Sequence, residues 1–123
     1  MSRTPKQILI VDDDGDIRET LSQILEEEGY GVLMASNGAE ALARLREAPC
    51  PDLILLDLMM PVMDGWQFRT EQRRDPALAE IPVIILSAAG NLHDNTRGFG
   101  AAATIKKPIY LDDLLEAIER HSR

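Results

Sequence analysis

The sequence predicts a single α/β domain in which a parallel β-sheet carries helices on both faces. Short apolar runs, which suit strands covered on both sides, alternate along the chain with segments that repeat apolar residues at helical spacing. Strands that alternate with helices are joined by right-handed crossovers, which make the strands parallel. Three of the predicted strands run into charged residues, so the chemistry is expected at the carboxyl edge of the sheet.

In the first half of the chain, the sequence pattern predicts two strands and two helices. Ile8–Val11 form the first strand, and the amphipathic helix that follows has acids in its first turn and Gly29 as its stop. A second strand is expected around Val32–Ala35. The turn Ser36-Asn37-Gly38 then leads into a helix that ends before Pro49.

The second half continues the alternation. A third strand lies within the run Asp52–Leu58, and a polar helix is expected from about Trp66 to Arg74. The fourth strand is predicted at Ile81–Leu86, followed by a weak helical stretch from about Leu92 to Phe99. A last strand, Thr104–Lys106, and a final amphipathic helix bring the prediction to five strands and five helices.

Length and composition narrow the class of protein. A chain of 123 residues fits one domain, so we expect residues 1–123 to form a single domain with no attached output domain. A net charge of −8 disfavours direct binding of nucleic acid, because binding a phosphate backbone needs clustered Lys and Arg. No signal peptide and no apolar run of roughly 20 residues is present, which predicts a cytoplasmic protein without membrane insertion. The lone Cys50 suits a reducing compartment.

Charged residues follow three of the predicted strands. Asp12 and Asp13 come after the first, Asp57 ends the third, and Lys107 follows the fifth. Two carboxylates about 4 Å apart repel by roughly 4 kcal/mol at an effective dielectric of 20, so a positive group is expected among them. Oxygen ligands of high charge suit Mg²⁺, and Lys107 would add a second positive charge. With Ser87 as a hydroxyl donor at the next strand end, the set predicts a phosphoryl-transfer site.

The order of these residues resembles the receiver domains of bacterial response regulators over essentially the whole chain. The resemblance rests on the following motifs: Asp12-Asp13, Asp57 with Met60-Pro61 and Asp64-Gly65, Ser87-Ala88, and Lys107-Pro108. It implies a flavodoxin-like (βα)5 fold with strand order 2-1-3-4-5.

The resemblance also implies roles for the acids. Asp57 would accept a phosphoryl group from the phosphohistidine of a histidine kinase or phosphotransfer protein. Mg²⁺ would be held by Asp13, Asp57 and the main-chain carbonyl of Met59, with Asp12 acting largely through a metal-bound water.

The remaining implications concern the switch. Ser87 and Lys107 would hold the phosphoryl group, and the Lys107-Pro108 peptide would be cis. The protein would be a signalling switch and not an enzyme: a single-domain response regulator that changes its affinity for a downstream protein through its fourth helix, fifth strand and fifth helix.

Several positions depart from the family pattern. Thr104 stands where an aromatic residue is common, and Arg69 and Gln72 occupy helix positions where leucine-like residues are expected. Met59 and Ala89 flank the phosphorylation site, and neither side chain can orient a water molecule through an acid or amide. The sequence therefore predicts a long-lived phosphorylated state.

Two alternative functions remain open. Asp12-Asp13-Asp14-Gly15-Asp16 resembles the start of haloacid-dehalogenase-type phosphatases, in which Asp12 would be the nucleophile and Asp14 the acid. Against this reading, Asp16 replaces a threonine and the chain is short. The second alternative is a docking module that keeps the fold but is not phosphorylated.

Overall fold

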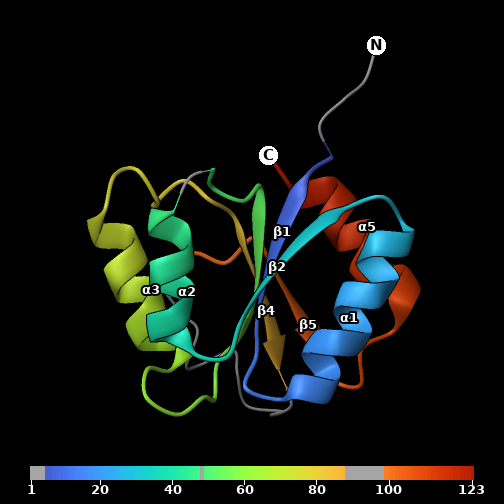
Figure 1. Ribbon diagram of the computed structural model, residues 1–123, viewed down its shortest axis with the longest axis horizontal. Helices are drawn as coiled ribbons and strands as arrows, with labels where there is room; N and C mark the ends of the chain where they lie inside the picture. Colours follow the sequence, from blue (N-terminus) through green and yellow to red (C-terminus); the bar gives the residue numbers. More distant parts are fainter. Residues whose placement is uncertain (1–4, 48, 88–98) are drawn as a thin grey trace.

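A five-stranded parallel sheet runs through the centre of the molecule, between two layers of helices (Figure 1). The structure is a computed structural model that describes residues 5–47, 49–87 and 99–123. The strand order is β2-β1-β3-β4-β5, and each neighbouring pair is parallel. This topology confirms the predicted flavodoxin-like fold.

The elements follow one another in the predicted order. The strands are β1 (Gln7–Val11), β2 (Gly31–Ala35), β3 (Leu53–Asp57), β4 (Val83–Ser87) and β5 (Ala103–Lys106). The helices are α1 (Gly15–Glu27), α2 (Gly38–Arg46), α3 (Gly65–Arg74) and α5 (Leu111–His121). The helical stretch predicted from about Leu92 lies outside the described residues, apart from Phe99 at its end.

The fourth strand begins two residues later than the predicted Ile81–Leu86. Ile54 of β3 stands opposite Val83, so the ladder between the two strands begins there. Ile81 is buried all the same, because it packs into the core from the connection that precedes the strand. At the other end, Ser87 belongs to β4.

The core consists of two layers, one on each face of the sheet. On one face, Leu9 and Val11 of β1 belong to a buried cluster that also contains residues of α2 and α3, two helices that lie on the same side of the sheet (Figure 1). On the other face, Ile8 and Ile10 belong to a second cluster, which also contains residues of α1 and α5. Neighbouring residues of a strand face opposite sides, so a continuous apolar run fills both layers.

Polar side chains begin three of the helices. Asp14 accepts hydrogen bonds from the backbone N–H groups of Asp16 and Ile17 at the start of α1, and Asn37 and Asp64 cap α2 and α3. At the start of α5, by contrast, the cap position holds Tyr110, whose side chain makes no capping bond and is 67% exposed.

The two ends of the described chain lie together at the edge of the sheet where the strands begin. Lys6 Nζ is 3.2 Å from Ser122 Oγ, and the backbone N–H of Arg123 donates to the carbonyl of Asp52, just before β3. Figure 1 shows both ends on the same side of the molecule.

Candidate functional site

Strands β1 and β3 bring three carboxylates together at their carboxyl ends. Val11 and Leu56 are partners in the parallel ladder. Asp12 and Asp57 are the residues that follow them, so the two acids emerge side by side. Asp13 completes the cluster, and one carboxylate oxygen from each residue lies within 4.8 Å of the others. Asp12 and Asp57 are buried, with 0% and 7% of their surface exposed, whereas Asp13 is exposed.

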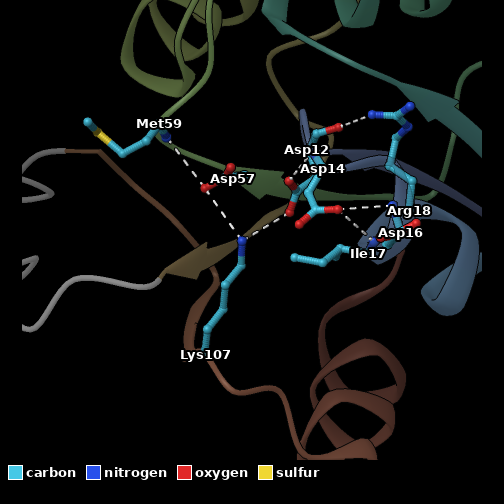
Figure 2. A network of polar contacts seen from close by, with 8 residues as sticks. All are labelled: Asp12, Asp14, Asp16, Ile17, Arg18, Asp57, Met59 and Lys107. Carbon is cyan, nitrogen blue, oxygen red and sulfur yellow. Dashed lines mark hydrogen bonds and ion pairs between the residues drawn. The ribbon is translucent and has the colours of Figure 1, made fainter.

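Lys107 reaches this cluster from the end of β5. Its Nζ lies 3.1 Å from Asp12 Oδ2 and 3.9 Å from Asp57 Oδ1, so one ammonium contacts both buried carboxylates (Figure 2). The backbone N–H of Lys107 donates to the carbonyl of Ser87 at 2.6 Å, which joins the ends of β4 and β5. The Lys107-Pro108 peptide bond is cis, as the resemblance implied.

The charge of Lys107 does not offset the whole cluster. Burial, and then the nearby charge of Asp12, raise the pKa of Asp57 from 3.8 to about 6, with a smaller contribution from Asp13. Lys107 and the backbone N–H of Met59, which donates to Asp57 Oδ1 at 3.4 Å, act in the opposite direction. Burial and the neighbouring acids thus outweigh the opposite effects of Lys107 and the Met59 N–H on the pKa of Asp57.

Asp12 is held in place by the start of α1. The backbone N–H of Asp14 donates to Asp12 Oδ1 at 2.9 Å, and Arg18 Nη1 donates to the Asp12 carbonyl at 2.6 Å (Figure 2). Arg18 was not singled out from the sequence, because only the first turn of the helix brings it back onto the strand end. Asp14 caps the helix and is exposed. It therefore does not join the carboxylate cluster, as the acid of the phosphatase alternative would have to do.

Ser87 and Met59 occupy the same edge. Ser87 is the last residue of β4 and is buried, and Asp57 pairs with its neighbour Leu86 in the ladder. Met59 lies two residues after Asp57 and has an exposed side chain. The structure thus brings all the predicted site residues to one edge of the sheet.

The loop after Asp57 contains a feature that the sequence did not predict. The backbone N–H of Met63 donates to the carbonyl of Pro61, and Val62 between them has φ of +70°, which defines a strained γ-turn. The loop is fastened by a hydrogen bond from the Gly38 N–H to the Met63 carbonyl at 2.9 Å. A side chain at Gly38 would collide with Met63, so this glycine allows the close approach.

The model of the family described as response regulator receiver domain matches residues 8–119. The chain belongs to this family. Among solved structures, this receiver domain is similar to the chemotaxis response regulator CheY4 of Vibrio cholerae, with a TM-score of 0.86 and 32% identity over 95% of this chain and 98% of that one. Receiver domains act in two-component signalling as phosphoryl acceptors and not as enzymes, in line with the prediction.

Curated relatives include longer proteins. The receiver domain is 40% identical to the DNA-binding dual master transcriptional regulator RpaA of Synechocystis over 91% of this chain and 47% of the relative. It is 38% identical to the phosphate regulon transcriptional regulatory protein PhoB of Escherichia coli over 93% of this chain and 50% of the relative. The chain therefore spans about half the length of these two relatives. The receiver domain is also 33% identical to Protein PilG of Pseudomonas aeruginosa, over 94% of this chain and 86% of that protein.

Proposed function

We propose that this receiver domain accepts a phosphoryl group on Asp57 from a phosphohistidine of a histidine kinase or phosphotransfer protein. The observation that supports this proposal is the position of Asp57, buried at a strand end beside two other carboxylates and the Lys107 ammonium. An Asp57 carboxylate oxygen would attack the phosphorus atom. The oxygen–phosphorus bond forms as the nitrogen–phosphorus bond breaks, and the electron pair returns to the imidazole nitrogen.

The chemistry of the cluster fits Mg²⁺. Its ligands are carboxylate oxygens, which this ion prefers, and the Lys107 ammonium pairs with two of the three carboxylates. Asp12, Asp13, Asp57 and the backbone carbonyl of Met59 would hold the ion. When bound, Mg²⁺ would offset the negative charge of the carboxylates and of the phosphoryl oxygens.

Lys107 and Ser87 would bind the incoming group. The Lys107 ammonium already lies near Asp57 and can move to a phosphoryl oxygen, since it is a point charge on a flexible stem. The Ser87 hydroxyl, at the adjacent strand end, would donate to another phosphoryl oxygen. Both residues thereby orient and neutralise the group.

We infer that this receiver domain works in the cytoplasm and passes its signal to another protein. No helix in the described ranges is long and apolar enough to cross a membrane. RpaA is named as DNA-binding and PhoB as a transcriptional regulator, but the net charge of −8 on this chain argues against direct contact with nucleic acid.

The test is phosphorylation by a small donor. We expect acetyl phosphate with Mg²⁺ to add one phosphoryl group to the wild type, read by intact-mass spectrometry and mapped to Asp57 by peptide analysis. Asp57→Asn and addition of EDTA should abolish labelling, whereas Asp14→Asn, which alters only an exposed helix cap, should leave it intact.

Three outcomes would contradict the proposal. Label on Asp12, or steady turnover of a small phosphate ester that Asp12→Asn abolishes, would favour the phosphatase. Absence of any label on folded protein in the presence of Mg²⁺ would favour the docking module.

A further inference from the structure

Arg69 of α3 holds the chain that leads into β5. Its Nε donates to the carbonyl of Phe99 at 2.9 Å, and its Nη2 donates to the carbonyl of Gly100 at 3.2 Å. The guanidinium also stacks on the buried ring of Phe99, with its central carbon 5.6 Å from the ring centroid. One side chain therefore fixes two consecutive carbonyls and a ring.

Gln72, one turn further along α3, accepts a hydrogen bond from Arg69. It is fully buried, and its Oε1 accepts a hydrogen bond from Arg69 Nη1 at 2.7 Å. Its Nε2 donates to the carbonyls of Leu78 and Ile81 at 2.9 and 3.1 Å, in the connection to β4. The network thus joins α3 to the chain before β4 as well as to the chain before β5.

The start of α3 is bound to the strand that carries Asp57. The backbone N–H of Gly65 donates to the carbonyl of Leu58 at 2.9 Å. The helix approaches so closely that a Cβ at Gly65 would lie 2.8 Å from Leu58 Cα and 2.9 Å from the Asp57 carbonyl oxygen. The first turn of α3 is therefore in close contact with the backbone of Asp57 and Leu58, and Arg69 is only about one turn from Gly65.

Arg69 has a strong energetic reason to keep its acceptors. Its three hydrogen-bond partners are neutral oxygens, and none of the ion pairs found in the described part of the chain involves it. Burial, and then the charge of Arg73, lower its pKa, so the cation is poorly solvated where it lies. Losing one acceptor would leave a charged donor unpaired, which favours joint movement of α3 and the Phe99-Gly100 segment.

We propose that Arg69 couples the phosphorylation site to the chain before β5: a change at Asp57 displaces α3, and Arg69 carries the displacement to Phe99 and Gly100. The inference rests on the proposed function, since phosphorylation supplies the change. Coupling between two sites is reciprocal. Cutting the link at Arg69 must therefore also change how tightly the site binds a phosphoryl mimic.

The sequence offers a direct probe, because Phe68 and Phe99 are its two phenylalanines. We would incorporate 4-fluorophenylalanine, assign the two signals with Phe68→Leu and Phe99→Leu, and record ¹⁹F NMR spectra with Mg²⁺ and beryllofluoride, a phosphoryl mimic. The fluorines of bound beryllofluoride report occupancy in the same spectrum. Phe68, buried in α3, reports the helix itself.

In the wild type we expect occupancy of the site to shift the Phe99 signal. In Arg69→Met the Phe99 shift should disappear while bound beryllofluoride is still visible, and the affinity for the mimic should change by at least about five-fold. Arg69→Lys keeps the charge but loses the forked arrangement of donors, so it should lose most of the Phe99 shift. This variant provides a second test in case Arg69→Met does not fold. Arg74→Met, at an exposed i,i+3 pair with Glu71, is the matched control and should behave as wild type.

Two results would overturn the inference alone: an unchanged Phe99 shift in Arg69→Met, or no Phe99 shift in wild type with beryllofluoride bound. Absence of bound beryllofluoride in folded wild type, as in Asp57→Asn, would remove the proposed function and the inference together.

Discussion

Asp57 is an ionisable side chain in surroundings that disfavour its charged form. It is buried at a strand end, and the carboxylate of Asp12 lies beside it. Burial, and then the charge of Asp12, raise the pKa of Asp57 to about 6, and Lys107 offsets this rise only in part. A carboxylate held in this way costs folding free energy until a cation joins it.

This arrangement predicts how stability depends on pH. Between pH 3.8 and about 6, folded Asp57 binds a proton more readily than unfolded Asp57, so its contribution to stability falls as pH rises through this window. In EDTA at pH 7.5, Asp57→Asn should therefore be more stable than wild type by about 1–2 kcal/mol, allowing for screening at the water-facing edge. The difference should vanish near pH 4. Urea denaturation at both pH values checks this, and an equal gain at each would contradict it.

Gly65 is a second residue on which the site depends. An added Cβ would meet backbone atoms of Leu58 and Asp57 at 2.8 and 2.9 Å, and backbone atoms cannot give way cheaply. We expect Gly65→Ala to lower the free energy of unfolding by about 1–3 kcal/mol. Gly15→Ala is the control, since a Cβ there would have only the Arg18 side chain nearby, at 3.5 Å. The same loss in both variants, measured by urea denaturation, would show that contact with the strand end is not the cause.

At the scale of elements, α5 lacks the cap that the other described helices have. Tyr110 makes no capping hydrogen bond, so the first N–H groups of the helix have no side-chain acceptor at this position. Tyr110→Ser should raise the free energy of unfolding by about 0.5–2 kcal/mol, because the serine hydroxyl can accept a hydrogen bond from a backbone N–H in the first turn of α5. Tyr110→Ala removes the ring without adding an acceptor. If thermal denaturation shows that Ala stabilises as much as Ser, the capping explanation fails.

The apolar pattern predicted the described elements well where burial and strand pairing coincide. It failed at Ile81, which is apolar and buried but lies before the strand, because a core residue in a connection looks the same as a strand residue. It also could not interpret Gln72, whose hydrogen-bond acceptors, the carbonyls of Leu78 and Ile81, belong to the chain beyond the helix. Both failures have one origin, since the partners of a residue depend on the tertiary fold.

The acid cluster was predictable for a different reason. Carboxyl ends of parallel strands share one edge, so residues that directly follow strands must meet there. Asp12, Asp57 and Lys107 do so. The positive φ of Val62 was not predictable, because its turn is held by a tertiary contact. That contact is the hydrogen bond from Gly38 of α2 to Met63.

At the scale of the whole molecule, the net charge of −8 and the acid cluster should make stability sensitive to divalent cations. We expect Mg²⁺ to raise the melting temperature of the wild type, with a gain of about 2.7 kcal/mol at a concentration 100 times the dissociation constant. Asp57→Asn should reduce the gain. Potassium chloride at the same ionic strength is the control, and an equal rise with it would indicate general screening and not a bound ion.

The hydrogen bonds between Lys6 and Ser122 and between Arg123 and Asp52 keep these residues at the amino ends of the strands. A five-residue strand at about 3.3 Å per residue puts roughly 16 Å of sheet between these ends and the acids. A fluorescent reporter or affinity handle attached after Arg123 would thus leave the approach to Asp57 clear. The closeness of Lys6 and Ser122 also makes circular permutation with a short linker between these residues feasible.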